Sequence, residues 1–224
     1  MLEVHPPDHP PHSAREFGIH LFTITIGLFI ALSLENAAEW VHHRHQRNEA
    51  DANIVSEIHD NQREVSEMLS AIPTEEKNLK KVLEFLQAHA AGRPYDLTSM
   101  SLGLTLGSLQ DASWKTATAT GAVSYMEYSH VKSYSAAYTL QDEFGSLQER
   151  TLDAYLRLQA YIVGGFDPDK MTPADADRAR LDVQQTMAKL EAMQQIGNAL
   201  KQTYDIALHP GKRTTLPYGT LAST

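Results

Sequence analysis

The sequence predicts an all-α protein in which an N-terminal transmembrane helix continues into an antiparallel four-helix-bundle-like domain with one short extra helix. Three observations support this prediction. Residues 17–34 (FGIHLFTITIGLFIALSL) carry no Asp, Glu, Lys or Arg, apolar residues recur at three- and four-residue steps through most of the remaining chain, and no segment has a convincing strand pattern. We therefore expect a proline- and histidine-rich tail at 1–13, a transmembrane anchor at 14–38, a helical bundle at 39–208 and a tail at 209–224.

The uncharged run is long enough to cross a bilayer. A helix of this length covers about 27 Å at about 1.5 Å per residue, close to the hydrocarbon thickness of about 30 Å. A cleaved signal peptide is one alternative, but its apolar core is about 7–15 residues long and follows a basic leader, whereas Arg15 is the one Lys or Arg before this run. A buried helix of a soluble protein is another, although the run is apolar on nearly all sides. We expect a retained, single-pass anchor in the lipid bilayer.

The composition limits the kinds of partner and site. The chain has 224 residues, with 28 acidic and 19 basic side chains and a formal net charge of −9. This balance argues against nucleic acid as a partner, because phosphate binding needs a basic patch. Cysteine is absent, which excludes disulfides, thiolate nucleophiles and cysteine-ligated zinc. The sequence also lacks the common nucleophile and phosphate-loop motifs, and we expect no cofactor.

Capping and stop signals divide the first half of the chain into helices. Ser13 is expected to cap a helix that runs through the membrane and on to Pro73, and Thr74 to cap a second helix that ends at Gly92. Residues 95–110 are compatible with either a loop or weak helical turns. The predicted buried faces of the two helices are Val41, Asn48, Ala52, Val55, Ile58, Gln62, Val65, Leu69 and Ile72, and then Leu79, Val82, Leu83, Leu86 and Ala90.

Three more helices are predicted in the second half. Asp111 is expected to cap a short helix, and Ser129 a long one that reaches about Val163. Thr172, followed by proline and then an acid at the third position, begins the last helix, which ends near His209. The apolar faces of the two long helices are Tyr134, Tyr138, Phe144, Leu147, Thr151, Tyr155, Leu158 and Ile162, and then Val183, Met187, Leu190, Gly197, Leu200, Tyr204 and Leu208.

One face of the anchor carries polar and small side chains. Small residues at this spacing let helices approach closely in lipid, and polar side chains there seek partners. The face predicts a homo-oligomer or docking on another membrane subunit; a monomeric anchor is the alternative. Its residues are His20, Thr23, Gly27, Ala31 and Glu35.

Aromatic and histidine residues follow the anchor directly. Trp40 suits the membrane interface, and Glu39 shares a helix face with His43, so that salt bridges can form there. The histidines are expected to contact lipid headgroups or, when paired with the glutamates, to respond to pH near about 6. The cluster comprises Glu39, Trp40, His42, His43 and His45.

Two E-x-x-H motifs raise a metal-binding alternative. Glu39 and His42 form the first, and Glu127 and His130 form the second. Two such motifs on facing helices, with further glutamates, would resemble a di-iron carboxylate bundle. Chance matches are common in a chain rich in Glu and His, so a metal-dependent enzyme is the minor alternative.

Aromatic residues gather in the second half of the chain. Tyr125, Tyr134 and Tyr138 could line a ligand pocket together with Trp114. Tyrosines at helical spacing more often pack in a core or an interface. A membrane-tethered sensor or ligand-binding module is therefore the second hypothesis for the function.

A resemblance to a known family rests on two stretches. Residues 15–50, with the core ITIGLFIAL followed by Glu35, Trp40 and the histidines, resemble an uncharacterised family of bacterial single-pass membrane proteins. The spacing from Trp114 to Gly121 is similar to a Trp-x₆-Gly element in that family's helical domain. The resemblance implies an anchor helix, a helical-bundle domain and the bacterial inner membrane, but no chemistry.

The orientation in the membrane has opposing indications. Arg15 precedes the anchor and Arg44 and Arg47 follow it, which favours a cytoplasmic bundle. Members of the resembled family often place this domain outside the cytoplasm, and we expect a periplasmic bundle. The main hypothesis is a structural or interaction subunit of a membrane assembly.

Overall fold

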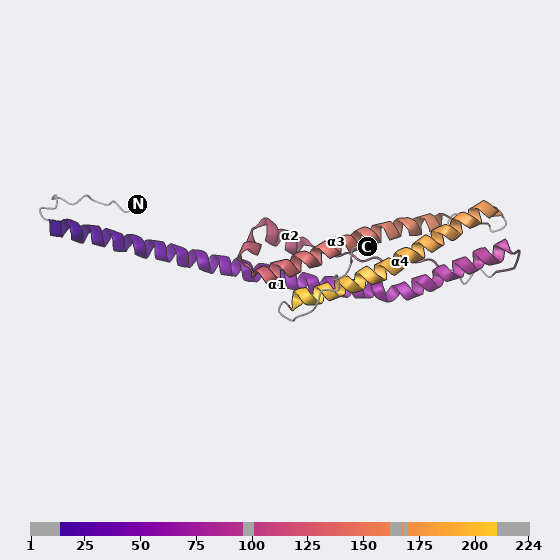
Figure 1. Cartoon of the computed structure of the whole chain (residues 1–224), viewed down its shortest axis with the longest axis horizontal. Coiled ribbons are helices and arrows are strands. Elements are labelled where there is room, and N and C mark those ends of the chain that lie inside the picture. Colours follow the sequence, from indigo (N-terminus) through magenta and orange to yellow (C-terminus); the bar gives the residue numbers. More distant parts are fainter. Residues whose placement is uncertain (1–13, 96–100, 162–166, 168–169, 210–224) are drawn as a thin grey trace, which may run out of the picture. The chain divides into compact units, whose positions relative to one another are not determined.

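The computed structural model describes residues 14–95, 101–161, 167 and 170–209, and the regular structure in these ranges is entirely helical. The elements are α1 (Ala14–Ala90), α2 (Ala112–Ala119), the 3₁₀ helix η2 (Ala122–Tyr125), α3 (Tyr128–Ala160) and α4 (Pro173–Leu208) (Figure 1). The predicted all-α architecture, with a long N-terminal helix followed by a helical domain, is confirmed. The predicted tail at 1–13, and the predicted tail at 209–224 except for His209, lie outside the described residues.

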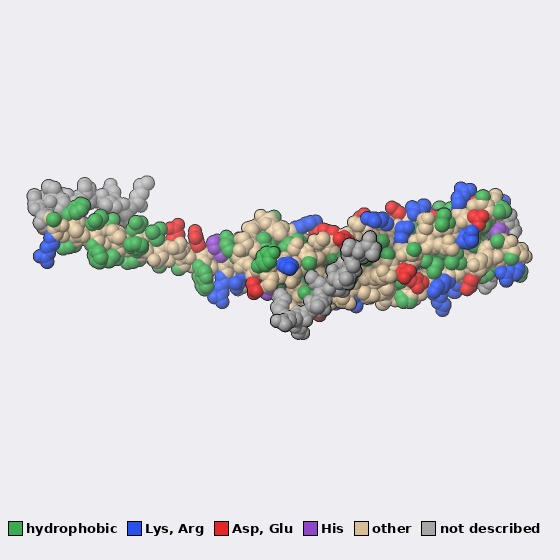
Figure 2. Space-filling model, in the orientation of Figure 1, with side chains coloured by type: hydrophobic (Ala, Val, Ile, Leu, Met, Phe, Trp, Pro, Cys, Tyr) green, Lys and Arg blue, Asp and Glu red, His purple; other side chains and the backbone are tan. Residues whose placement is uncertain are grey.

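The chain divides into two compact units, Met1–Asn48 and Glu49–Thr224, and α1 contributes to both. In the first unit the large apolar side chains of residues 17–34 are between 42 and 69 % exposed, and hydrophobic atoms cover this part of α1 (Figure 2). Among the described residues, α1 is the one helix long and apolar enough to cross a membrane, and none of its apolar window is buried. This mainly apolar and exposed part of α1 is therefore a candidate membrane span.

The second unit buries a core between three long helices. Tyr138 of α3 is bonded to Glu57 of α1, and one helical turn further along each helix Gln141 is bonded to Asn61, so these helices run parallel. Helix α4 runs antiparallel to α3 and packs against it along its length (Figure 1). The most completely buried large side chains are Ile54, Ile58, Met68, Leu79, Tyr134, Phe144, Tyr155, Leu158, Leu190, Met193, Leu200 and Tyr204.

The predicted faces of α3 and α4 are largely confirmed, but the predicted face of α1 is displaced. Ile58, Val65, Leu69 and Ile72 are buried as expected, whereas Val41, Asn48, Ala52 and Ala90 are exposed. The buried positions missing from the predicted face of α1 are Ile54, Glu57, Asn61, Met68, Glu75, Phe85 and Ala88. Three of these seven are polar, and an apolar pattern does not include them.

The predicted helix break at Pro73 is wrong, because α1 continues through this residue to Ala90. Pro73 is exposed, while Ile72 and Glu75 on either side of it are buried. A proline inside a helix removes one backbone hydrogen bond and costs about 3 kcal/mol. Packing on both sides of the proline offsets this cost, so residues 74–90 prolong α1 instead of folding back beside it.

Local signals predicted the other helix ends with mixed success. Thr172 caps α4 with the expected capping box, and α4 ends at Leu208 as expected. Helix α2 begins after Asp111, although the Asp111 side chain makes no capping hydrogen bond. The prediction of Ser129 as a cap is wrong: Glu127 is the N-cap of α3, and the Ser129 hydroxyl donates to the Glu127 carboxylate at 2.6 Å.

In the stretch 95–110, residues 95 and 101–110 are non-helical, which favours the loop there, and residues 96–100 lie outside the described residues. Residues 101–110 run back along α1, because Thr105 is bonded to Glu75 and Gln110 to Asn61. The segment also contacts α3, through Gly103 and Gly107. We call residues 101–111 the strap; it lies between α1 and α3 and antiparallel to both.

Candidate functional site

The predicted association face of the anchor is open in the first unit. Its five residues, His20, Thr23, Gly27, Ala31 and Glu35, are all exposed. The Thr23 hydroxyl donates to the Ile19 carbonyl at 2.9 Å, and a Cβ atom added at Gly27 would meet no atom within 4 Å. The face is thus free for a second helix, and association through it stays a prediction.

The residues that follow the anchor form an exposed aromatic and cationic cluster. The Arg44 guanidinium lies 5.3 Å from the centre of the Trp40 ring, within cation–π range. The rings of His42 and His43 are 6.0 Å apart and tilted by 53°. A Trp–Arg pair of this kind suits the headgroup region of a bilayer. A pH response of the cluster stays a prediction.

In the part of the chain that the structure describes, no group of three or more His, Asp or Glu side chains converges, and a metal site built from the two E-x-x-H motifs stays a prediction. Glu127, at the start of α3, accepts the hydrogen bond from Ser129. The His130 Nδ1 atom lies 3.6 Å from the Asp51 carboxylate. Glu39 and His42 belong to the first unit, whereas Glu127 and His130 belong to the second.

Three of the four predicted pocket residues come together, as a packed cluster. Trp114 stacks on Tyr138, with ring centres 5.6 Å apart and planes at 8°, and meets the edge of Tyr134 at 6.5 Å. Tyr138 donates to Glu57 at 2.6 Å, and Tyr134 donates to Asp51 at 2.7 Å. Burial, and then these hydrogen bonds, raise the pKa of both tyrosines well above 10. The cluster fastens α2 and α3 to α1.

Tyr125, the fourth predicted pocket residue, does not join this cluster's ring contacts. It lies in η2 and is 41 % exposed. The turn before η2 requires Gly121, whose φ is +75°. A left-handed residue here explains why a glycine ends the Trp-x₆-Gly element.

Buried polar side chains, which the sequence analysis missed, hold the strap and the residues after it. The backbone groups of the strap form hydrogen bonds with side chains of α1 and α3, and not with a neighbouring strand as they would in a sheet. Their contacts are Glu75 to Thr105 N at 2.6 Å, Asn61 to Gln110 N at 2.8 Å, Glu57 to Ser113 N at 2.8 Å, Gln148 to Gly107 N at 3.1 Å and Tyr155 to Gly103 O at 2.6 Å. Each contact satisfies a backbone group that a non-helical segment would otherwise leave unpaired in a protein interior.

Gln141 is the centre of this polar network. Its Oε1 atom accepts from Tyr204 of α4 at 2.6 Å and from Asn61 of α1 at 3.0 Å. Its Nε2 atom donates to the Gln110 carbonyl at 2.9 Å. One buried amide thus joins three helices and the strap, and burial raises the pKa of Tyr204 well above 10.

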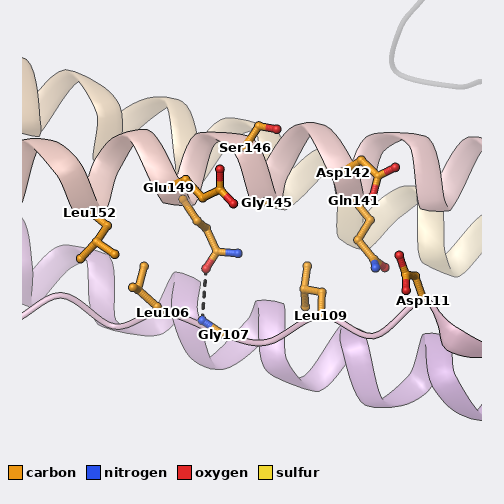
Figure 3. A pocket seen from close by; sticks show the side chains of 11 residues that line it. Leu106, Gly107, Leu109, Asp111, Gln141, Asp142, Gly145, Ser146, Glu149 and Leu152 are labelled. Atoms are coloured by element: carbon orange, nitrogen blue, oxygen red, sulfur yellow. Dashed lines mark hydrogen bonds between the residues drawn. The ribbon is translucent and has the colours of Figure 1, made fainter.

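A groove of about 520 Å³ lies between the strap and α3 (Figure 3). Leu106 and Leu109 project from the strap toward α3. The α3 side is lined by Gln141, Asp142, Gly145, Ser146, Gln148, Glu149 and Leu152, and Asp111 closes one end of the strap side. Glycine and serine in the middle leave the helix backbone accessible to a bound molecule.

The groove is acidic as well as partly apolar. Asp111, Asp142 and Glu149 line it, and no Lys or Arg is among its described lining residues. Lys115 lies beside it and forms an ion pair of 2.6 Å with Asp111. The hydrogen bond and charge of Asp111 raise the pKa of Lys115 above its usual value. The groove and its edge therefore carry one positively charged side chain, Lys115, and three carboxylates.

A signal in the sequence does point to this site. Glu57, Asn61 and Glu75 of α1 occupy the three- and four-residue rhythm of the buried face, as Gln141 and Gln148 do in α3. Polar residues in an otherwise apolar stripe need buried partners. In this protein the partner is the backbone of a non-helical segment, which no local pattern could identify.

No protein-family model, curated protein or solved structure matches this chain. The resemblance to a family of bacterial membrane proteins therefore stays a prediction, and the function has to be argued from the chain's own geometry.

Proposed function

We propose that the protein is a single-pass membrane protein whose helical bundle acts as a structural or interaction subunit of a membrane assembly. The observation that carries this proposal is the exposed apolar run of α1. Residues 17–34 are mainly apolar, and none of this window is buried among the residues that the structure describes. At about 25 cal/mol per Å², leaving so many large side chains in water is costly, and lipid removes that cost.

The bundle supports the interaction part of the proposal. It is well packed, and every buried side-chain nitrogen and oxygen in its described residues has a hydrogen-bond partner. The polar side chains clustered in its core form the hydrogen bonds that hold the strap. Together with the resemblance described above, this favours the bacterial inner membrane, a periplasmic bundle, and a homo-oligomer or a partner subunit.

Two measurements test this function. Membranes from cells that produce the full chain are washed with alkaline carbonate and sedimented, and we expect the chain in the pellet. Native mass measurement in mild detergent is then expected to give an oligomer or a stable complex. A chain that stays in the supernatant without detergent contradicts the anchor, and a strictly monomeric, partner-free chain contradicts the subunit role.

The orientation is tested separately. In spheroplasts, protease added outside is expected to remove the bundle if it is periplasmic. Protection of the bundle until the cells are lysed would place it in the cytoplasm and leave the anchor unaffected.

A membrane-tethered binding module is the second candidate function. The groove beside the strap favours it, because it is concave and combines apolar side chains with unneutralised carboxylates. Ligand sites commonly combine apolar walls with a few polar groups in this way.

A further inference from the structure

We propose that the groove between the strap and α3 binds an extended peptide segment of a partner protein, in which two basic side chains flank apolar ones. The inference rests on the proposed role as an interaction subunit and names the surface used. Its basis is a combination of shape, a spare hydrogen-bond donor and charge in one place.

The shape suits a main chain lying along α3. Gly145 and Ser146 form the middle of the α3 wall, and a Cβ atom added at Gly145 would meet no atom within 4 Å. A peptide backbone can therefore come close to the helix there. Leu106 of the strap is 42 % exposed, and Leu109 and Leu152 line the groove with it. These three side chains provide the apolar contact.

Gln148 provides a hydrogen-bond donor for a peptide carbonyl. This side chain is 8 % exposed, and its carbonyl oxygen accepts from Gly107 N at 3.1 Å. Among the described residues, none accepts a hydrogen bond from its amide nitrogen, although the side chain lines the groove. Because every buried side-chain nitrogen in the described residues has a partner, this nitrogen faces the solvent of the groove, where a peptide carbonyl can take the place of water.

The charges select basic side chains and set their spacing. Asp142 and Glu149 stand two turns apart on α3, about 10 Å along its axis. In an extended peptide of polyproline II type, residues three apart project on the same side and are separated by about 9 Å, at about 3.1 Å per residue. Two Lys or Arg residues with two residues between them can thus reach both carboxylates. Asp111, at the Asp142 end, is already paired with Lys115 at 2.6 Å, so Asp142 and Glu149 are the two carboxylates that a basic peptide would meet.

A displayed library of random heptapeptides tests this proposal on the full chain in mild detergent. We expect the selected peptides to be enriched in pairs of Lys or Arg separated by two residues, with an apolar residue between them. A selected peptide is then measured by fluorescence anisotropy. We expect its affinity to fall at least tenfold for the double variant Asp142→Asn/Glu149→Gln, and to weaken with added salt.

The matched control removes the same charge from α3 outside the groove. Glu143 and Asp153 are exposed and do not line the groove, and the double variant Glu143→Gln/Asp153→Asn should bind within twofold of the unchanged chain. A second variant, Gly145→Trp, fills the groove and should abolish binding. Circular dichroism melts of all variants exclude unfolding as the cause.

Three results would overturn the proposal: no enrichment, selected peptides that are acidic or purely apolar, or peptides that bind the Gly145→Trp variant equally well. A change of oligomeric state in the groove variants would make a second copy of this chain the occupant, and would overturn it too. Carbonate pelleting of the same chain keeps the two proposals apart. A chain that pellets but selects no peptide defeats the groove proposal alone.

Discussion

The two units of the molecule place the same kinds of side chain in opposite surroundings. In the first unit Phe29 is 64 % exposed, whereas in the second Phe144 is fully buried. Conversely, the polar Asn61 and Gln141 lie inside the bundle, while its outer positions are mostly polar or charged. Helix α1 passes through both arrangements without a break. One continuous helix thus exposes its large apolar side chains in one part and buries them in another, and its sequence changes from the first pattern to the second between residues 35 and 54.

Shortening the same aromatic side chain in each unit gives the largest expected contrast. Phe144→Ala is expected to destabilise the bundle by about 3–5 kcal/mol, because it leaves a cavity in the core. Phe29→Ala should leave the bundle's stability unchanged. Urea unfolding of the full chain in mild detergent, followed by circular dichroism, measures both. Equal effects would mean that the first unit packs against protein after all.

A charge placed in each unit gives the next contrast. Gly27→Arg puts a cation at the middle of the apolar run, where insertion into lipid costs about 2.5–3.5 kcal/mol. We expect this variant to shift largely from the carbonate-washed pellet to the supernatant or to aggregates. Gln87→Arg, at an exposed position of α1 in the bundle, should remain in the pellet. If both variants pellet alike, lipid does not surround the run.

Two glycines in the helices of the bundle should respond oppositely to substitution, because one is in close contact with other helices and the other faces open space. A Cβ atom at Gly197 would lie 2.7 Å from Leu69 Cδ2 and 3.1 Å from Phe144 Cε2, so Gly197→Val should cost about 1–3 kcal/mol. At Gly145 there is open space, and Gly145→Ala should stabilise the protein by about 0.5–1 kcal/mol through helix propensity. The same urea titration measures both changes in the free energy of unfolding. A stabilising effect of Gly197→Val would show that α4 does not approach α1 so closely.

The smallest expected effect concerns pH and the strap. Burial, with the nearby Glu75 charge, raises the pKa of Tyr155 to about 12. A raised tyrosine pKa stabilises the folded state below the unfolded pKa of about 10, and this contribution is lost as the pH rises toward 12. Tyr155→Phe should cost about 0.5–1.5 kcal/mol at pH 8, through the lost bond to Gly103.

The pH dependence distinguishes this contribution from simple packing. Between pH 10 and 12 the difference between the unchanged chain and Tyr155→Phe should shrink. Tyr128→Phe is the control, because Tyr128 is 80 % exposed. A difference that stays constant up to pH 12 would show that the Tyr155 hydroxyl is not buried in the folded protein.

The parts of this structure that sequence patterns could predict are those set by local chemistry. The start of α4 follows from a hydroxyl, a proline and an acid within four residues, and each acts on the helix end itself. The exposed apolar run is visible in composition alone. Pro73 led to a wrong prediction of a helix end, because tertiary packing of Ile72 and Glu75 outweighs the local cost of the proline. This packing is not visible in the sequence.

The groove was missed for a related reason. Its walls come from residues 106–111 and 141–152, which are distant in the chain, and the strap has no periodicity of its own. The aromatic residues of the Trp114 cluster were predicted to lie together, but as the lining of a pocket and not as packed rings. Aromatic content alone does not distinguish a cavity from stacked rings.

The way the strap is held has a consequence for how this protein tolerates change. In a helix or a sheet the backbone pairs with itself, so most side chains can vary without loosening it. Here the path of residues 103–113 depends on hydrogen bonds from the ends of six side chains, Glu57, Asn61, Glu75, Gln141, Gln148 and Tyr155. Drift at any one of these distant positions would release part of the strap while leaving every helix intact.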